Sequence, residues 1–291
     1  MQKIFSIQGG LSIGHAKLVC QDLCRLMNYF SPEGVIARPN EQGLIYEGSS
    51  FFPKYVRYGE LVVTDNGEVV VKLDFDSGTA PNESEAMHKM LSNKLARYFE
   101  YKEVPFNKKV FCIGWSKTGT MSLIQALRIL GLFSWHFAPW IVGYHHFSDE
   151  IANYKLEFST IEPYTAIADL PVSLIYKELD KAFPESLFIF TTRSLDCWLP
   201  SAMSDAKTME EQFGRLGAAY RLAYGLEKPE RQKFTERYKQ HYQEVTEYFS
   251  DRSNILSIDI THENTWDKLC TFLNLPIPNT EFPHLNHLSV D

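Results

Sequence analysis

The stretch that decides the fold runs from residue 109 to residue 131 and reads KVFCIGWSKTGTMSLIQALRILG. Its first six residues, 109–114, are an apolar run of the length that suits a buried strand. A glycine-containing turn follows, and residues 120–130 read as a helix, with Gly131 placed where helices commonly end in glycine. We therefore predict a strand, a short loop and a helix in immediate succession.

The same alternation continues along the rest of the chain. Residues 185–192 and 254–260 are further apolar runs that suit buried strands, and LFSWHF at residues 132–137 ends another. We expect helices between them, at residues 172–183, 195–206, 210–224 and 233–249. Strands that alternate with helices indicate an α/β fold, a parallel sheet with helices on both faces, whose ligands bind at the carboxyl ends of the strands.

The first hundred residues have a different pattern, so we divide the chain into a small N-terminal α+β module, residues 1–105, and the α/β domain, residues 106–291. Asp65-Asn66-Gly67 lies between two valine-rich runs, a pattern typical of a hairpin in an antiparallel sheet. A strand at residues 3–8 and helices at residues 15–30 and 84–101 complete the module. It carries no chemical motif, which leaves open whether it covers the pocket, recognises acceptors or forms a homodimer.

Composition excludes several classes of protein. The 291 residues contain 29 Lys and Arg against 36 Asp and Glu, a formal net charge of −7, which argues against a general binder of nucleic acid or of an anionic membrane. The five cysteines form no C-x-x-C pair, so we expect free thiols and no zinc site. The start is a poor signal peptide, and no apolar run approaches the roughly 20 residues that cross a bilayer. We expect a cytoplasmic protein.

The loop GWSKTGTMS, residues 114–122, predicts an anion site. Glycine lets the backbone approach a ligand, and the start of the following helix presents N–H groups and a positive dipole end. Lys117 adds a full positive charge, and Thr118, Thr120 and Ser122 add hydroxyl donors. Phosphate is the usual ligand of such a loop. The alternative is a turn between strand and helix that binds nothing.

The loop is not a Walker A sequence. G-x-x-x-x-G is present from Gly114 to Gly119, but Thr120-Met121 follows where Lys-Ser/Thr belongs. The lysine lies inside the loop instead, and the hydroxyl residue that would hold Mg²⁺ is not in its usual place. A metal-dependent nucleotide triphosphatase is therefore disfavoured, and we expect no metal site.

A second anion point follows the strand at residues 185–192. Arg193 lies where such a sheet presents its ligand groups, and Ser201 comes eight positions later, within reach across a turn and the start of a helix. A guanidinium fork and a neutral hydroxyl suit a second phosphate. The alternative is that Arg193 pairs with a carboxylate such as Asp196 while Ser201 is a solvated helix residue.

These two motifs together resemble a known family. GWSKTGTMSL looks like the 5′-phosphosulfate loop of P-loop sulfotransferases, and TTRSLDCWLPS looks like their 3′-phosphate motif, an arginine with a serine eight residues on. Within that family the chain resembles the subgroup of small sulfotransferase-like proteins. His136 in LFSWHF, Asp169 in ADLP and the tail LCTFLNLPIPNTEFPHLN match its pattern in order, and the resemblance spans residues 109–286.

The resemblance implies the donor 3′-phosphoadenosine 5′-phosphosulfate and transfer of its sulfuryl group to a hydroxyl or amine acceptor. It implies that Arg193 and Ser201 hold the 3′-phosphate and that Lys117 also stabilises the leaving oxygen. Met121 departs from the family, which usually has a hydroxyl residue there. The residues implied to hold the 5′ end are Ser116, Lys117, Thr118, Gly119, Thr120, Met121 and Ser122.

An acceptor hydroxyl needs a general base, and the two leading candidates are His136 and Asp169. His136 has aromatic neighbours, which suit a desolvated base. Asp169 precedes a predicted helix, where it could also serve as a helix cap. Glu162 and Glu178 are further candidates. The residues do not choose between a small-molecule and a sugar acceptor.

Two other functions compete with a sulfotransferase. The first is a nucleotide kinase or triphosphatase, in which Asp259 at the end of the strand NILSID would act near Mg²⁺. The second is a non-catalytic scaffold that binds a nucleotide in a degenerate pocket.

Overall fold

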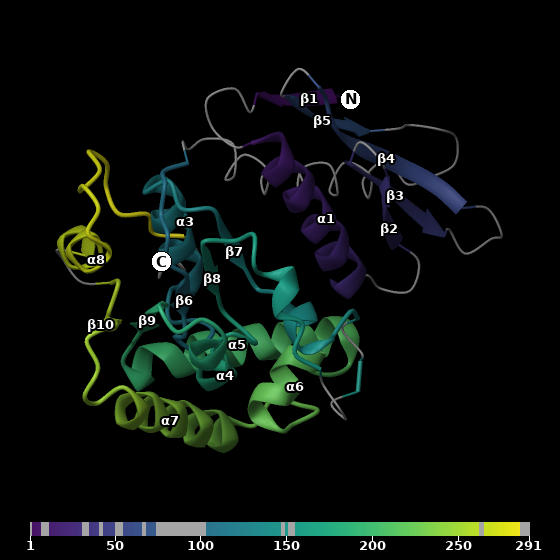
Figure 1. Cartoon of the computed structure of the whole chain (residues 1–291). Helices are drawn as coiled ribbons and strands as arrows, with labels where there is room; N and C mark the ends of the chain where they lie inside the picture. The colour runs from purple at the N-terminus through teal and green to yellow at the C-terminus, as the bar shows by residue number, and fades with distance from the viewer. Residues whose placement is uncertain are drawn as a thin grey trace. The chain divides into compact units, whose positions relative to one another are not determined.

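The chain forms two compact units. A computed structural model describes residues 2–6, 12–30, 35–40, 43–49, 55–65, 68–73, 103–146, 149–150, 155–261 and 265–285 (Figure 1). The first unit is Met1–Glu103 with His145–Phe147, and the second is Val104–Tyr144 with Ser148–Asp291.

The first unit contains an antiparallel sheet of five strands in the order β1-β5-β4-β3-β2. Helix α1 (Ile13–Phe30) packs on β2, β3 and β4 and buries apolar side chains at helical spacing, among them Val19, Cys20 and Leu23. A helix on an antiparallel sheet is the predicted α+β arrangement. The strands are β1 (Gln2–Ser6), β2 (Val35–Asn40), β3 (Gly43–Ser49), β4 (Tyr55–Val63) and β5 (Glu68–Leu73).

The local predictions for this unit that fall on described residues are confirmed. The strand predicted at residues 3–8 is β1, and the helix predicted at 15–30 is α1. The valine-rich runs are β4 and β5, which pair antiparallel with Val63 opposite Val69. Asn66, Gly67 and the helix predicted at residues 84–101 lie outside the described residues.

The second unit is built on a parallel sheet of five strands in the order β10-β9-β6-β8-β7. Strand β6 lies at its centre and leads through the glycine-containing loop into α3 (Thr120–Ile129), which confirms the predicted succession of strand, loop and helix. The strands are β6 (Val110–Cys112), β7 (Ser134–His136), β8 (Ala166–Ala168), β9 (Leu187–Thr191) and β10 (Ile255–Ile258).

Helices cover both faces of this sheet, as predicted (Figure 1). Val110 and Cys112 of β6 belong to an apolar cluster with α3 and α8 (Thr265–Leu273). Phe111, between them in the sequence, points to the opposite face, where β9 packs against Phe249 at the end of α7 (Arg231–Tyr248). Because side chains alternate along a strand, burial on both faces requires the continuous apolar runs that the sequence shows.

The helices after β9 differ from the prediction in their boundaries. Helix α5 (Leu195–Phe213) continues seven residues past its predicted end and stops at Gly214, which has a left-handed φ of 74°. The helix predicted at residues 210–224 is therefore split, and only α6 (Ala218–Tyr224) remains of its second part. The helix predicted at residues 172–183 starts later, as α4 (Tyr176–Ala182).

The sequence reading did not identify strand β8. Its three residues, Ala-Ile-Ala, are too few to show a periodic pattern, and pairing with β6 and β7 establishes the strand. Two short 3₁₀ helices, η1 (Pro139–Val142) and η2 (Phe158–Thr160), lie between β7 and β8. Since the strands are parallel, the residues that follow β6, β7, β8 and β9 meet at one edge of the sheet.

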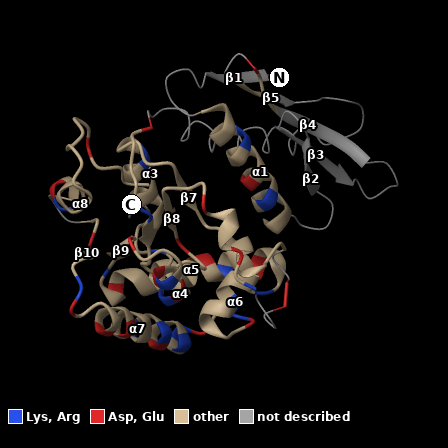
Figure 2. Cartoon of the chain, viewed as in Figure 1, with Lys and Arg blue, Asp and Glu red and all other residues tan. Residues whose placement is uncertain are grey.

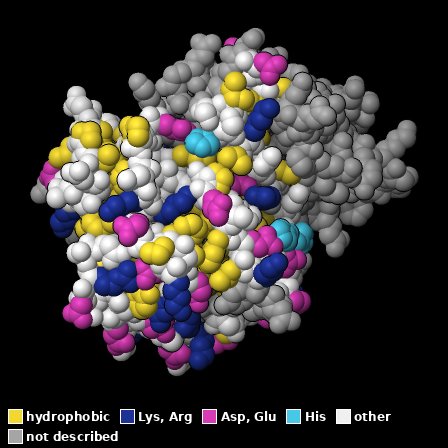
Figure 3. Space-filling model, viewed as in Figure 1, with side chains coloured by type: hydrophobic (Ala, Val, Ile, Leu, Met, Phe, Trp, Pro, Cys, Tyr) yellow, Lys and Arg dark blue, Asp and Glu magenta, His cyan; other side chains and the backbone are white. Residues whose placement is uncertain are grey.

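Charges are mixed over the described surface. Helix α7 carries both acidic and basic side chains (Figure 2), and on the face shown in Figure 3 the two signs are interspersed over the described residues. Within the described ranges, none of the helices has the combination of length and apolar character that crossing a membrane requires.

Candidate active site

The loop between β6 and α3, residues 114–119, is called the glycine loop below, and close packing fixes its first residue. A Cβ atom on Gly114 would lie 1.8 Å from Oγ1 of Thr191, at the end of β9. Thr118 is buried, and its Oγ1 lies 2.6 Å from Oγ1 of Thr191 and donates to the Trp115 carbonyl at 2.6 Å. The loop is therefore tied to the neighbouring strand, and only glycine fits at its start.

The second glycine of the loop places the start of α3. Gly119 has a φ of 95°, and a Cβ there would lie 2.2 Å from Cδ1 of Ile260. It caps α3 without a side-chain hydrogen bond, so the helix begins with backbone N–H groups that lack intrahelical partners. Such a helix start attracts anions.

Lys117 is held at two points. Its backbone is left-handed, with a φ of 72°, and its carbonyl accepts a hydrogen bond from Nη1 of Arg193 at 3.2 Å. Its Nζ lies 3.3 Å from Oδ1 of Asp205 on α5. The loop lysine and the arginine that follows β9 are thus in direct contact, as expected if the two predicted anion points belong to one site.

One cavity of about 530 Å³ collects most of the predicted site residues. From the predicted donor site it is lined by Ser116, Lys117, Gly119, Thr120, Met121, Arg193 and Ser201, and from the predicted bases by His136 and Asp169. The remaining lining residues are Ser204, Asp205, Thr208, Tyr220 and Leu285, which the sequence reading did not select.

Two predicted donor ligands do not line the cavity. The Thr118 hydroxyl turns inward to β9, as described above. Ser122 is buried on α3, where its Oγ accepts a hydrogen bond from the backbone N–H of Leu285 at 2.8 Å. Of the three hydroxyls predicted around the lysine, Thr120 is the one whose residue borders the cavity.

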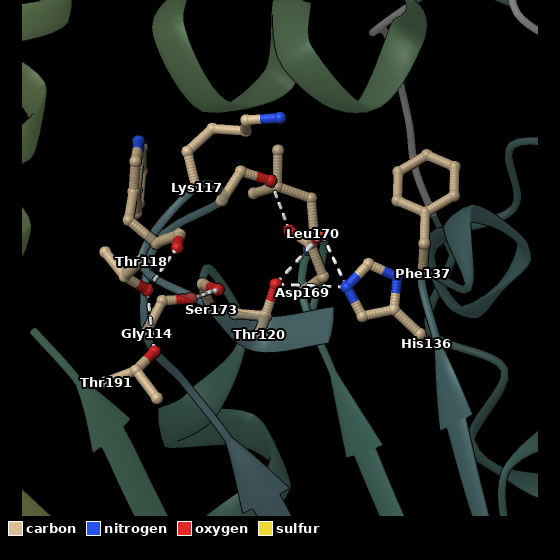
Figure 4. A network of polar contacts seen from close by, with 12 residues as sticks. Gly114, Lys117, Thr118, Thr120, His136, Phe137, Asp169, Leu170, Ser173 and Thr191 are labelled. Carbon is tan, nitrogen blue, oxygen red and sulfur yellow. Dashed lines mark hydrogen bonds and ion pairs between the residues drawn. The ribbon is translucent and has the colours of Figure 1, made fainter. Parts of the chain in front are cut away.

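A polar cluster centred on Asp169 also borders the cavity (Figure 4). Asp169 follows β8 directly and has a φ of 73°. Its Oδ2 lies 3.0 Å from Nε2 of His136, which follows from the pairing of β7 with β8, and Thr120 Oγ1 lies 3.0 Å from the same nitrogen. Its Oδ1 accepts hydrogen bonds from the Ser116 hydroxyl and from the Leu170 N–H.

These contacts determine the charge state of Asp169. Burial raises the pKa of its carboxyl, but the His136 imidazole and the hydrogen bonds from His136, Ser116 and Leu170 outweigh burial and hold the pKa below its ordinary value. Asp169 is therefore ionised at neutral pH. An ionised carboxylate only accepts hydrogen bonds, so Nε2 of His136 is the donor in this contact.

Backbone strain coincides with this site. In the described part of the chain, four non-glycine residues have a positive φ, and two of them, Lys117 and Asp169, line the cavity. Such conformations persist where the surrounding contacts over-determine them, and they concentrate at functional sites.

Several other candidates from the sequence reading lie outside the cavity lining: Glu162, Glu178 and Asp259. Asp259 instead accepts hydrogen bonds from the backbone and hydroxyl of Thr261. Trp198 is a packing residue, because it is buried, stacks on Tyr238 and donates from Nε1 to the Ser116 carbonyl. Among the described residues, no group of three or more His, Cys, Asp or Glu side chains is placed to hold a metal ion.

The unpredicted residues on α5 do follow a sequence rule. Ser204, Asp205 and Thr208 lie three, four and seven positions after Ser201, the spacing of one helix face. Knowing that Ser201 faces the cavity therefore identifies the other three. Tyr220 and Leu285 come from distant parts of the chain, and no local pattern marks them.

Comparison with known proteins agrees with this architecture. The profile of the family described as "Sulfotransferase domain" matches residues 109–289, more than half of the chain. A curated relative, the Ava biosynthesis cluster protein M of Aspergillus versicolor, is 26% identical over 211 residues, which are 61% of this chain and 80% of that protein. The family match covers the parallel sheet and every residue that lines the cavity, and on that ground the chain belongs to the sulfotransferase-domain family.

Proposed function

We propose that the protein transfers a sulfuryl group from 3′-phosphoadenosine 5′-phosphosulfate to a hydroxyl or amine of a small-molecule or sugar acceptor. The observation that carries the proposal is the contact between Arg193 and Lys117, 3.2 Å from Nη1 to the carbonyl oxygen. It brings two cations from neighbouring strands into one cavity, and a ligand with phosphates at both ends of a nucleoside needs two such points.

The residues present fit this donor. The start of α3 and the Thr120 hydroxyl would hold its 5′ end, and Arg193 with Ser201 would hold the 3′-phosphate, the group that ATP lacks. Thr118 and Ser122 would contribute through the backbone, since their side chains are engaged elsewhere. Met121 offers its amide and no hydroxyl, so we expect fewer side-chain contacts to the 5′ end than the sequence suggested.

Catalysis would rest on positioning and charge. The donor supplies a sulfuryl group bonded to a phosphate leaving group, and Lys117 would stabilise the negative charge that develops on the oxygen between them. Asp169 stays ionised and fixes the imidazole of His136, which makes His136 the better candidate to take the acceptor proton. Asp169 would then stabilise the imidazolium that forms.

The competing kinase hypothesis depends on Asp259, which does not border the cavity. Asp259 would have to approach the nucleotide, but it binds Thr261 and does not border the cavity. The scaffold reading differs from ours only in turnover, so a binding experiment has to be followed by an activity measurement.

Isothermal titration of the full chain with 3′,5′-bisphosphoadenosine, 5′-AMP and ATP with Mg²⁺ tests the proposal. We expect the bisphosphate to bind tightest. Arg193→Ala should lose about 2 kcal/mol of bisphosphate binding, roughly thirtyfold, while 5′-AMP binding changes little. Arg231→Ala, an exposed arginine on α7, is the matched control, and Lys207→Ala is the control for Lys117→Ala.

Three results would contradict the proposal. Tighter binding of ATP with Mg²⁺ than of the bisphosphate favours the kinase. Equal losses of 5′-AMP and bisphosphate binding in Arg193→Ala remove the 3′-phosphate assignment. Bisphosphate binding with no consumption of the phosphosulfate donor, across a panel of phenols, amines and sugars, supports the scaffold.

A further inference from the structure

Asp205 is a charged residue of the cavity that the proposed transfer reaction does not use. It lies on α5, and its Oδ1 is 3.3 Å from Nζ of Lys117. Its other oxygen, Oδ2, accepts a hydrogen bond from the hydroxyl of Tyr220 at 2.5 Å. Tyr220 is buried on α6 and lines the same cavity, so the carboxylate is anchored from behind while it faces the lysine.

Among the described residues, the charge of Lys117 is paired at a single point. The Lys117 carbonyl is held by Arg193, but in the described part of the chain Asp205 is the acidic group within ion-pair distance of its Nζ. The side chains of Lys117 and Asp205 are 29% and 32% exposed, so water reaches the pair and it can separate at modest cost. The ammonium can therefore leave the carboxylate if a stronger anion arrives.

Resting on the function proposed above, we infer that Asp205, fixed by Tyr220, is a positioning residue and the displaceable counter-ion of Lys117. It pairs with the lysine ammonium until the donor nucleotide binds and replaces it. Donor binding is then an exchange of one ion pair for another. This exchange lowers the affinity for the nucleotide, because the pair between Lys117 and Asp205 must separate first.

Ion-pair exchange predicts that removing the charge of one cavity residue strengthens ligand binding, whereas substitutions inside a binding cavity usually weaken it. Asp205→Asn keeps the size of the side chain and an oxygen for the Tyr220 hydroxyl but removes the charge. We expect it to tighten binding of 3′,5′-bisphosphoadenosine about threefold to tenfold, measured by calorimetry on the full chain. Asp205→Glu should return affinity toward that of the wild type. Glu211→Gln removes one exposed charge from the same helix and controls for a long-range effect.

A double-mutant cycle separates ion-pair exchange from simple repulsion between Asp205 and the ligand. Repulsion acts whether or not the lysine is present, whereas exchange requires Lys117. We therefore expect Asp205→Asn to tighten binding at least threefold more in the wild type than in a Lys117→Met background. Tyr220→Phe releases the carboxylate from its anchor and should tighten binding by less than Asp205→Asn does.

Each outcome decides the inference. If the wild type does not bind the bisphosphate, both the proposed function and this inference are overturned. If the wild type binds it and Asp205→Asn binds equally or more weakly, the inference alone is wrong. If Asp205→Asn tightens binding equally in both backgrounds, Asp205 only repels the ligand, and the exchange is overturned.

Discussion

Oγ1 of Thr118 and Oγ1 of Thr191 lie 2.6 Å apart and join the glycine loop to the carboxyl end of β9. Thr191 is buried, and Arg193 follows it by two residues. The bond therefore fixes the loop relative to the strand that carries the arginine. A hydroxyl predicted to bind a ligand thus acts inside the protein, where it positions the groups that face the cavity.

Thr191→Val tests this role. Valine has the same shape but cannot hydrogen-bond, and Thr118 keeps its second partner, the Trp115 carbonyl. We expect the free energy of unfolding to fall by about 1 kcal/mol, measured by urea denaturation. Thr235→Val, which removes a solvent-exposed hydrogen bond on α7, is the control and should change stability less. Equal losses in the two variants would show that the buried hydrogen bond contributes no more to the free energy of unfolding than the exposed one.

Gly119→Ala separates backbone strain from steric overlap. Alanine at this position meets a φ of 95° and a Cβ only 2.2 Å from Ile260. Gly214→Ala is a matched control, because Gly214 also has a left-handed φ, 74°, but has nothing within 4 Å of its added Cβ. We expect a loss of about 1 kcal/mol in Gly214→Ala and a clearly larger one in Gly119→Ala, measured by denaturation. Equal losses would mean that Ile260 moves aside without cost.

His241 predicts a pH dependence of stability. Burial lowers its pKa from 6.5 to about 4, and its Nε2 lies 2.9 Å from the Ile113 carbonyl. Between pH 6.5 and 4 the unfolded chain binds a proton that the folded chain does not, so stability is full above this window and falls as the pH falls through it. The loss is about 3 kcal/mol for a shift of this size.

His241→Gln should remove this part of the pH dependence, because glutamine still donates a hydrogen bond but does not titrate in that range. His284→Gln, near the C-terminus, is the control for loss of one histidine. The measurement is the free energy of unfolding of the three proteins at several pH values between 7 and 4. A variant with the same slope as the wild type would show that His241 does not carry the dependence.

The two candidate bases can be distinguished by turnover. If His136 takes the proton, His136→Gln should lower kcat by about 100-fold or more, while bisphosphate affinity stays within about threefold of the wild type. Asp169→Asn should also lower kcat, because the imidazole loses the carboxylate 3.0 Å away. A His136→Gln enzyme that keeps its activity while Asp169→Asn loses it would make Asp169 the base.

The sequence by itself determined the strand–loop–helix unit, the parallel sheet and the family. Each depends on order along the chain: an apolar run, a glycine turn and a helical period are neighbours in sequence, and local propensity with burial decides them. The eight-residue spacing of Arg193 and Ser201 also depends on order along the chain, and both residues line the cavity. Helix ends were less well predicted, since Gly214 ends α5 where apolar periodicity continues.

Only the tertiary structure decided which hydroxyls face the ligand and which carboxylates face the cations. Thr118 turns toward Thr191, Ser122 toward Leu285 and Lys117 toward Asp205, each across dozens of residues of sequence. The pairing of β7 with β8 brings His136 to Asp169 through a strand of three residues that no pattern marks. These contacts depend on which segments pack together, and a hydrogen bond responds to distances of tenths of an ångström that residue order does not encode.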